Sequence, residues 1–203
     1  MFAPQTGMEL YPAICVSVAY ERGSINLNRS LWSKLMYYLT PDRMYSGVGD
    51  IDVIELYGAG ISGIIADLDN TLITPGAKQP DARMVNFIDA ARDIGFDICL
   101  LSNSSRRRVV RVSSGLGIYA VAKAGKPSGA GFIKAMRLLG RDHSRVCVIG
   151  DQLFTDVLGA KRFGIMAIYT APFTGREEIT VKLKRLAEYF IFRFCLGYTD
   201  NVN

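Results

Sequence analysis

The feature that most constrains the fold is an alternation of two patterns that begins near Ile61. Short apolar runs with the character of buried β-strands are each followed by a turn and a segment with helical periodicity. This order is typical of a parallel β-sheet covered by helices. We therefore predict an α/β fold of three layers around a central parallel sheet of about five strands. The expected strands are 63–69, 97–103, 118–123, 145–151 and 165–170, and the expected helices lie near 81–94, 105–115, 128–139, 153–163 and 177–193.

Length and composition favour one globular core. The chain has 203 residues, of which 49% are hydrophobic and 21% charged, so a wholly disordered or collagen-like chain is excluded. No apolar stretch approaches the roughly 20 residues of a membrane-spanning helix. The N-terminus also lacks a basic region ahead of an apolar one, so we expect a cytoplasmic protein. The four cysteines form no C-x-x-C pair, which favours reduced, structural thiols.

Basic residues outnumber acidic ones and allow anionic partners. The formal net charge is +5, which permits phosphate esters, acidic lipids or nucleic acid and identifies none of them. We expect no nucleic-acid partner. One basic cluster follows the second expected strand and another lies near the C-terminus: Arg106, Arg107, Arg108 and Arg111, then Lys182, Lys184, Arg185 and Arg193.

Carboxylates lie where the expected strands end. Asp67 and Asp69 are at the end of the first strand and Ser102 is at the end of the second, while Asp151 ends the fourth and Asp156 follows it. Because right-handed crossovers bring the carboxyl ends of parallel strands to one edge, these residues should converge where open α/β proteins bind ligands. Such a cluster offers only hard oxygen ligands and suits Mg²⁺ held together with a substrate phosphate.

A lysine and a serine would complete a phosphate site at this edge. Lys126, on the loop after the third strand, could neutralise a phosphoryl oxygen and the charge of Asp67. Ser102 and the backbone amides beyond it could donate to a second phosphoryl oxygen. Each part alone has an ordinary structural explanation, as a turn residue or a helix cap. Their joint order and spacing favour the functional interpretation.

These residues resemble the four motifs of the haloacid dehalogenase superfamily of phosphatases. The motifs stand here as DLDNT, LLSN, the lysine of GKP, and GDQLFTD. The run from Lys34 to about Ile191 is similar to the YqeG-type subfamily, which is related to phosphatidylglycerophosphate phosphatase. The resemblance implies a Rossmann-like fold and an aspartyl-phosphate mechanism.

The resemblance also implies a role for each residue. Asp67 would be the nucleophile and Asp69 the general acid and base. The Asp67 carboxylate, the Asp69 carbonyl and Asp151 would hold Mg²⁺, and Ser102, Asn103 and Lys126 would bind the phosphoryl group. Arg108 matches a basic position of the subfamily and could contact substrate. Asp156 would support the metal ligands from behind, although a helix-capping role for it remains open.

Spacing predicts an open active site. Only 32 residues separate Asp69 from Ser102 and 23 separate Ser102 from Lys126, and the expected helix and strand in each gap leave no room for a cap domain. An open site favours a lipid headgroup at a membrane, a macromolecule or another subunit over a small sugar. We expect an extension over 1–30, the phosphatase core over 31–175, and a basic amphipathic helix and tail over 176–203. Trp32, Tyr37 and Tyr38 should pack against the sheet or its edge.

The C-terminal segment carries an apolar stripe with two interpretations. It either packs on the sheet as the last helix or lies at a membrane interface. Beyond Tyr189 the segment is apolar on every side, which suits insertion into an interface or a contact between subunits of a homo-oligomer. The stripe consists of Ile179, Leu183, Leu186, Phe190 and Phe194.

Three functions therefore remain open. The first is a Mg²⁺-dependent phosphomonoesterase acting on a lipid-linked phosphate such as phosphatidylglycerophosphate, at the inner face of the membrane. The second is a phosphatase of a soluble or protein-bound phosphate. The third is a regulatory protein that only binds phosphate and Mg²⁺, although such a protein has no need of an acid and base at Asp69.

Overall fold

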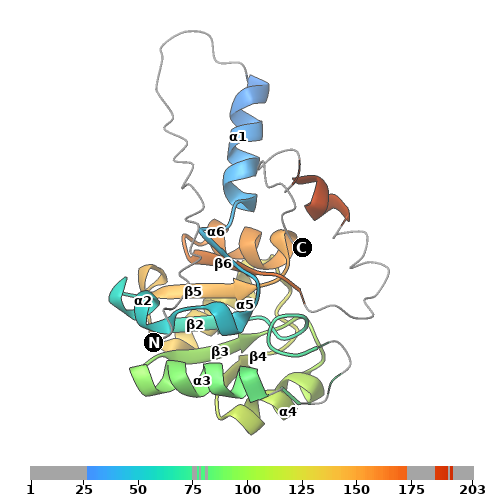
Figure 1. Ribbon diagram of the computed structural model, residues 1–203. Coiled ribbons are helices and arrows are strands. Elements are labelled where there is room, and N and C mark those ends of the chain that lie inside the picture. The colour runs from blue at the N-terminus through green and yellow to red at the C-terminus, as the bar shows by residue number, and fades with distance from the viewer. Residues whose placement is uncertain are drawn as a thin grey trace, which may run out of the picture.

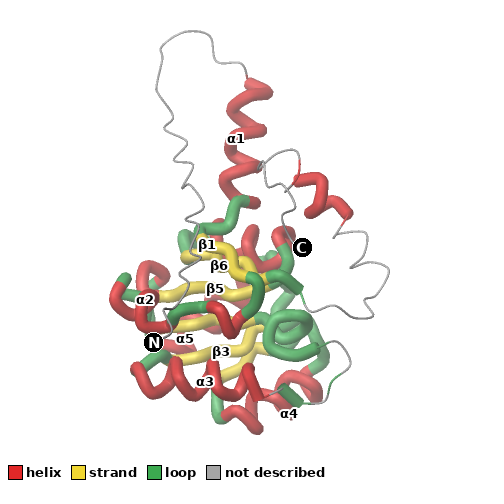
Figure 2. The backbone as a smooth tube through the Cα atoms, in the orientation of Figure 1, coloured by secondary structure: helices red, strands yellow, loops and turns green. Residues whose placement is uncertain are grey.

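The structure is a computed structural model that describes residues 27–74, 77, 79–80, 82–172, 186–191 and 193. Its centre is one sheet of six parallel strands in the order β1-β6-β5-β2-β3-β4. Figure 2 shows the strands side by side in yellow. The strands are β1 (Arg43–Tyr45), β2 (Gly63–Ala66), β3 (Asp97–Leu101), β4 (Tyr119–Val121), β5 (Val146–Gly150) and β6 (Met166–Thr170).

Helices cover both faces of this sheet (Figure 1). Buried residues of α2, α3 and α4 belong to the core on one face, and buried residues of α1, α5 and α6 belong to the core on the other. The helices are α1 (Leu27–Leu39), α2 (Val53–Gly58), α3 (Ala82–Ile94), α4 (Arg106–Leu116), α5 (Gly129–Leu139) and α6 (Leu158–Arg162). Between them lie short 3₁₀ turns, η1 (Val48–Asp50) and η2 (His143–Arg145), and a π-helical turn, η3 (Leu153–Val157). The predicted three-layer α/β fold is confirmed.

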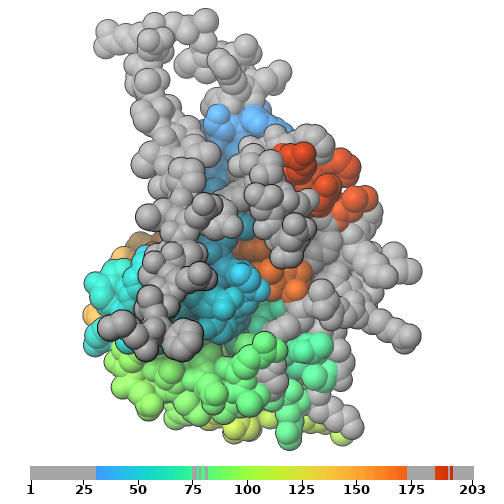
Figure 3. Space-filling model, in the orientation of Figure 1, coloured from blue at the N-terminus to red at the C-terminus, as the bar shows by residue number. Residues whose placement is uncertain are grey.

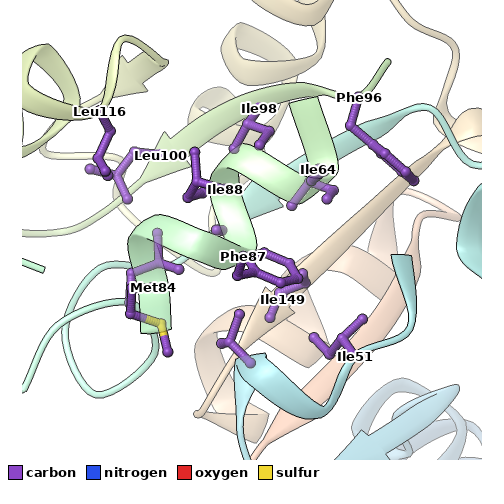
Figure 4. Close-up of a cluster of buried hydrophobic side chains, with 14 of the residues drawn as sticks. Ile51, Ile64, Met84, Phe87, Ile88, Phe96, Ile98, Leu100, Leu116 and Ile149 are labelled. Carbon is purple, nitrogen blue, oxygen red and sulfur yellow. The ribbon is translucent and has the colours of Figure 1, made fainter. Parts of the chain in front are cut away.

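Alternation along the central strands creates the two cores. In β2, Ile64 faces one core and Ile65 the other, because successive side chains of a strand point to opposite faces. Figure 4 shows Phe87 and Ile88 of α3 packed over Ile64 and Ile149 of the sheet. All four residues of β2 are buried, as expected for a central parallel strand.

The sheet has six strands rather than about five, and the additional strand is β1. Directly before β1, the Asp42 N–H donates to the Ala167 carbonyl of β6 (2.7 Å), and the Asp42 carboxylate accepts from the Ala167 N–H (2.8 Å). β1 pairs with β6 over three residues, all of them half-buried. A strand so short and so partly covered carries no continuous apolar run, which is why the sequence pattern does not reveal it.

α1 does not pack as predicted. Only its end enters the core, where Leu39 is buried and Met36 packs beside it. Trp32 and Tyr37 are 53% and 58% exposed, and Tyr38 is also exposed, so the predicted packing of these three rings is wrong. The helix extends away from the sheet beyond β6 (Figure 1), and part of it is visible at the surface in blue in Figure 3.

Part of the C-terminal segment is described as a helix over 186–190. Leu186 and Phe190, which belong to the predicted apolar stripe, are exposed. The residues that dock are different ones: Ile191 packs on the core, and the buried Glu188 accepts a hydrogen bond from the Leu153 N–H at 2.7 Å. The other predictions for this segment, and the prediction for residues 1–26, concern positions outside the described residues. In the part of the chain that is described, no helix is long and apolar enough to cross a membrane.

The connections that matter for the site are short. Among the described residues between Asp69 and Ser102, α3 and β3 are the only helix and strand, and β4 alone lies between α4 and Lys126. No cap domain interrupts the core within these stretches.

Candidate active site

The loop after β2 separates two aspartates that are close in sequence. Asp67 still belongs to the sheet, because its N–H donates to the Ile149 carbonyl of β5 at 2.9 Å. The chain then turns through Asn70, which adopts the left-handed φ of 66° that asparagine tolerates better than most residues. The Leu72 N–H returns to the Leu68 carbonyl at 3.1 Å and closes the turn. As a result Asp67 is buried, whereas Asp69 lies at the rim.

Lys126 joins two of the predicted acidic residues. Its ammonium donates to Asp67 and, at 2.6 Å, to Asp156 Oδ1. Asp67, Lys126 and Asp156 are 6%, 8% and 2% exposed, so this is a buried ionic cluster. The sequence predicts the contact with Asp67, and the structure adds the one with Asp156.

Asn103 fixes the loop that carries this lysine. The Lys126 N–H donates to Asn103 Oδ1 at 2.9 Å, and Asn103 Nδ2 donates back to the Lys126 carbonyl at 3.3 Å. A paired amide contact of this kind sets both the position and the direction of the Lys126 backbone. The structure thus gives Asn103 a positioning role, and its predicted contact with the phosphoryl group stays a prediction.

β5 ends in a tight arrangement around Gly150. Asp151 is fully buried and accepts a hydrogen bond from Thr71 Oγ1 at 3.3 Å. The chain then enters η3, a π-helical turn of a kind often found at functional sites, which directs Asp156 back over Gly150. A Cβ atom at Gly150 would lie 2.4 Å from Asp156 Cγ, so the absence of a side chain there makes room for the Asp156 carboxylate.

Burial and charge act against each other in this cluster. Burial raises the pKa of the Asp67 carboxyl to about 7; the Lys126 ammonium opposes this rise, and the Asp156 carboxylate adds to it. Burial alone would lower the pKa of Lys126, but Asp156 and Asp67 outweigh it and raise that pKa above its usual value. Lys126 is therefore a permanent cation, while Asp67 is held between its two forms in the metal-free protein.

The donor set fits a divalent cation. Asp67, Asp151 and Asp156 each offer a carboxylate oxygen, and these three oxygens lie within 4.8 Å of one another. With all three ionised, three negative charges face one lysine, which leaves an excess of two buried negative charges. Uncompensated buried charge is strongly destabilising, and one divalent ion would balance it. Three hard oxygens match the preference of Mg²⁺.

Asp69 belongs to a second cluster. Arg108 donates to Asp69 Oδ1 through Nε (3.1 Å) and Nη2 (2.7 Å), and Ser104 Oγ donates to Oδ2 at 2.6 Å. The third guanidinium nitrogen of Arg108 donates to the Ala77 carbonyl at 3.1 Å. The carboxylate of Asp69 is thus not in the metal-binding triad, and the predicted metal contact through its carbonyl stays a prediction.

Among the described contacts of the four arginines on α4, only those of Arg108 reach the predicted site residues. Arg106, Arg107 and Arg111 are exposed on α4. Ser102 is buried at the end of β3, where its Oγ accepts from the Ser104 N–H at 3.1 Å, so that hydroxyl faces the start of α4.

Sequence reasoning overlooked Ser104 and Thr71. Both are small hydroxyl residues beside recognised motif positions, and each contacts a carboxylate: Ser104 that of Asp69 and Thr71 that of Asp151. Thr71 lies within the DLDNT motif, and Ser104 directly follows LLSN. Their position beside the motifs was the available signal, but a serine or threonine there is equally typical of a turn.

The part of the chain that carries this site is similar to known proteins. The model of the haloacid dehalogenase-like hydrolases matches residues 55–164, a range that contains both clusters. The chain is 32% identical over 154 residues to "Probable phosphatase YqeG" of Bacillus subtilis (strain 168), covering 76% of this chain and 90% of that protein. It is 23% identical over 186 residues to "Phosphatidylglycerophosphate phosphatase 1, chloroplastic" of Chlamydomonas reinhardtii, covering 86% and 69% of the two chains.

Solved structures include a haloacid dehalogenase-like hydrolase from Brucella suis 1330. It aligns with a TM-score of 0.47 at 14% identity and covers 61% of this chain and 93% of that one.

Proposed function

Since the chain belongs to the haloacid dehalogenase-like hydrolase family, we propose that this phosphatase hydrolyses a lipid-linked phosphomonoester such as phosphatidylglycerophosphate, with Mg²⁺ and through an aspartyl-phosphate. Family membership and the named relatives support phosphatase activity itself. The ion, the intermediate and the lipid substrate are the parts that we propose.

The observation that carries the proposal is the buried cluster of Asp67, Lys126, Asp151 and Asp156 at the carboxyl edge of the sheet. Phosphoryl transfer needs a nucleophile beside cationic groups that stabilise charge on the phosphoryl oxygens. Asp67 supplies the nucleophile, and Lys126 contacts it directly. Asp67, Asp151 and Asp156 would hold Mg²⁺, which when bound supplies a Lewis acid that polarises a phosphoryl oxygen.

In the first step, a carboxylate oxygen of Asp67 attacks phosphorus. The bond between phosphorus and the leaving oxygen breaks, and Asp69 donates a proton to that oxygen so that the alcohol departs neutral. Lys126 remains charged throughout, because its raised pKa keeps the proton on its ammonium, and it stabilises the phosphoryl oxygens. Ser102 donates to another of these oxygens from the end of β3.

In the second step, a water molecule attacks the phosphorus of the aspartyl-phosphate. Asp69 takes the proton of this water, the bond between phosphorus and Asp67 breaks, and inorganic phosphate leaves. Asp69 can serve both steps because it lies two residues beyond the nucleophile, at the rim where an alcohol leaves and water enters. Its side chain is 36% exposed, against 8% for that of Asp67.

Three features support a lipid substrate. The described residues contain no cap that would close over a small molecule, and a relative is named as a phosphatidylglycerophosphate phosphatase. The exposed face of α1 also suits a bilayer interface, where tryptophan and tyrosine are enriched. α1 contacts η3, the element that carries Asp156, so this surface is attached directly to the site. Its exposed apolar residues are Leu31, Trp32, Leu35, Tyr37 and Tyr38.

The test is phosphate release from phosphatidylglycerophosphate in mixed micelles, with and without Mg²⁺. We expect turnover that requires the ion and is lost in Asp67→Asn, a variant of nearly equal volume. A variant with Leu31, Trp32 and Leu35 changed to serine should lose activity on micelles and keep it on a soluble aryl phosphate. Glycerol 3-phosphate serves as a second soluble substrate.

The outcomes separate the parts of the proposal. Activity retained by Asp67→Asn would overturn the nucleophile. Wild-type turnover of the soluble esters alone would keep the phosphatase and remove the lipid. Equal losses of the α1 variant on micelles and on aryl phosphate would remove α1 from lipid recognition, since they would indicate damage to the fold.

A further inference from the structure

Arg108 is hydrogen-bonded to Asp69, the residue proposed as the general acid of the reaction. Two of its N–H groups point at Asp69 Oδ1, at 3.1 and 2.7 Å, and the Ser104 hydroxyl donates to Oδ2 at 2.6 Å. Both oxygens of Asp69 are therefore acceptors in this arrangement. To protonate a leaving group, one of them must instead carry a hydrogen and present it to the alcohol oxygen.

The two partners of Asp69 differ in their ability to adapt. The Ser104 hydroxyl can rotate and accept a hydrogen bond, because it is both donor and acceptor. The Arg108 guanidinium has only donors, so while it stays on Oδ1 a proton can be placed only on Oδ2. Arg108 therefore restricts Asp69 to one oxygen, and Oδ1 becomes available once Arg108 binds another anion.

Breaking the ion pair between Arg108 and Asp69 costs little free energy if another anion takes the place of the Asp69 carboxylate. The side chains of Arg108 and Asp69 are 28% and 36% exposed, and ion pairs of this exposure stabilise proteins little. A guanidinium binds phosphate oxygens with the same forked geometry that it uses for carboxylates. Since Asp69 faces the leaving oxygen, the anion that attracts Arg108 must belong to the leaving group.

We propose that Arg108 forms a subsite for a phosphate or phosphodiester in the leaving group, and that it exchanges the Asp69 carboxylate for this anion when the substrate binds. This inference rests on the proposed function and narrows its substrate class to phosphomonoesters whose alcohol carries a second anionic phosphorus group. A lipid headgroup and a soluble diester both provide this chemistry.

The experiment compares two soluble alcohol phosphates. Deacylated phosphatidylglycerophosphate carries a phosphodiester in its leaving group, and glycerol 3-phosphate does not. We expect wild type to prefer the first, and Arg108→Gln to lower kcat/KM for it by roughly 10- to 100-fold more than for glycerol 3-phosphate. Arg108→Lys keeps the positive charge and loses the forked donor geometry, so its preference for the diester substrate should lie between those of wild type and Arg108→Gln. The matched control is Arg111→Gln, an exposed arginine on the same helix, which should leave the preference unchanged.

A binding measurement guards against damage to the fold, because Arg108 also holds the Ala77 carbonyl. Glycerophosphoglycerol, which has the diester and lacks the phosphomonoester, should inhibit wild type competitively and inhibit Arg108→Gln at least tenfold more weakly, while inorganic phosphate inhibits both alike. Thermal unfolding of each variant is recorded in parallel.

Three results would overturn the inference. Equal losses on both soluble substrates would show that Arg108 only positions Asp69. A loss confined to micellar phosphatidylglycerophosphate, absent with its deacylated form, would assign Arg108 to the membrane surface. If wild type with Mg²⁺ releases phosphate from none of these esters, the proposed function itself fails, and this inference with it.

Discussion

The two acidic clusters at the carboxyl edge use similar chemistry in opposite surroundings. Asp67 meets Lys126 in the interior, and Asp69 meets Arg108 at the rim. Inside, neither partner can turn to water, so the charges must be balanced by protein groups or by a bound cation. At the rim, water can replace either partner at little cost. Burial thus fixes Lys126 beside Asp67, where it can hold the phosphoryl group. Exposure leaves the contacts of Asp69 exchangeable, which suits proton transfer.

The largest effect should come from removing the cation of the buried cluster. Lys126→Met leaves Asp67 and Asp156 without their shared partner, and we expect the metal-free protein to lose about 3–5 kcal/mol of unfolding free energy. Turnover should be lost as well. Mg²⁺ should restore more stability to this variant than it adds to wild type, because the ion then compensates more unpaired charge. Urea unfolding with and without Mg²⁺ measures both values.

Lys161→Met is the matched control for this prediction. Lys161 also pairs with an aspartate, Asp42, and the two side chains are 10% and 36% exposed, so water reaches the carboxylate of this pair. We expect a loss of about 1 kcal/mol and no effect on turnover. Equal destabilisation by the two lysine variants would mean that burial does not distinguish the clusters.

The pH dependence of stability should reveal the buried Asp67. Its pKa is raised from 3.8 to about 7 in the folded, metal-free protein, so the folded state binds this proton more tightly than the unfolded state. The resulting stability is complete below pH about 4 and is lost as pH rises through about 7. Relative to Asp67→Asn, wild type should therefore lose up to about 1.4 kcal/mol per pH unit within this window.

Urea unfolding of both proteins without metal, between pH about 4.5 and 8, gives this difference. Repeating the series with saturating Mg²⁺ should flatten it, because an ion on Asp67 favours the ionised form. A wild-type advantage that grows with pH would contradict the sign of the shift.

The sequence predicted the inner part of the site better than its rim. Asp67 and Asp151 follow central strands whose apolar runs are easy to recognise, and Lys126 follows the edge strand β4. Parallel topology brings the ends of these strands together. Asp156 is different: its place in the triad depends on a π-helical turn and on the missing side chain of Gly150. No periodicity encodes such a turn.

The rim and the edge of the sheet depend on contacts between distant segments. Arg108 of α4 reaches Asp69 in the loop after β2, and nothing in the spacing of the two residues predicts this pair. β1 escaped prediction because it is three residues long and only half-buried. Trp32, Tyr37 and Tyr38 were expected to pack against the sheet or its edge, yet composition cannot tell a core face from an exposed one.

Crowding around Asp156 should make Gly150 intolerant of any side chain. In Gly150→Ala the new Cβ would meet Asp156 Cγ at 2.4 Å, so the carboxylate must move away from Lys126. We expect a loss of about 1–3 kcal/mol, as for other overpacked positions, together with weaker Mg²⁺ binding. Gly115→Ala is the control, since nothing lies within 4 Å of a Cβ there, and alanine favours the helix. Thermal unfolding and Mg²⁺ titration of the two variants would contradict this reasoning if both behaved alike.

The smallest effect should come from the pair at the rim. Arg108→Gln should change the unfolding free energy by less than about 1 kcal/mol, because water replaces the lost contacts. A double-mutant cycle of Arg108→Gln with Asp69→Asn should give a coupling energy of similar size, and this energy should decrease with added salt. A cycle of Lys126→Met with Asp156→Asn should give a larger coupling energy that is less sensitive to salt. Equal coupling energies would mean that Arg108 is held as firmly as Lys126. Arg108 could then not leave Asp69 cheaply, and the proposed transfer to a substrate anion would lose its energetic basis.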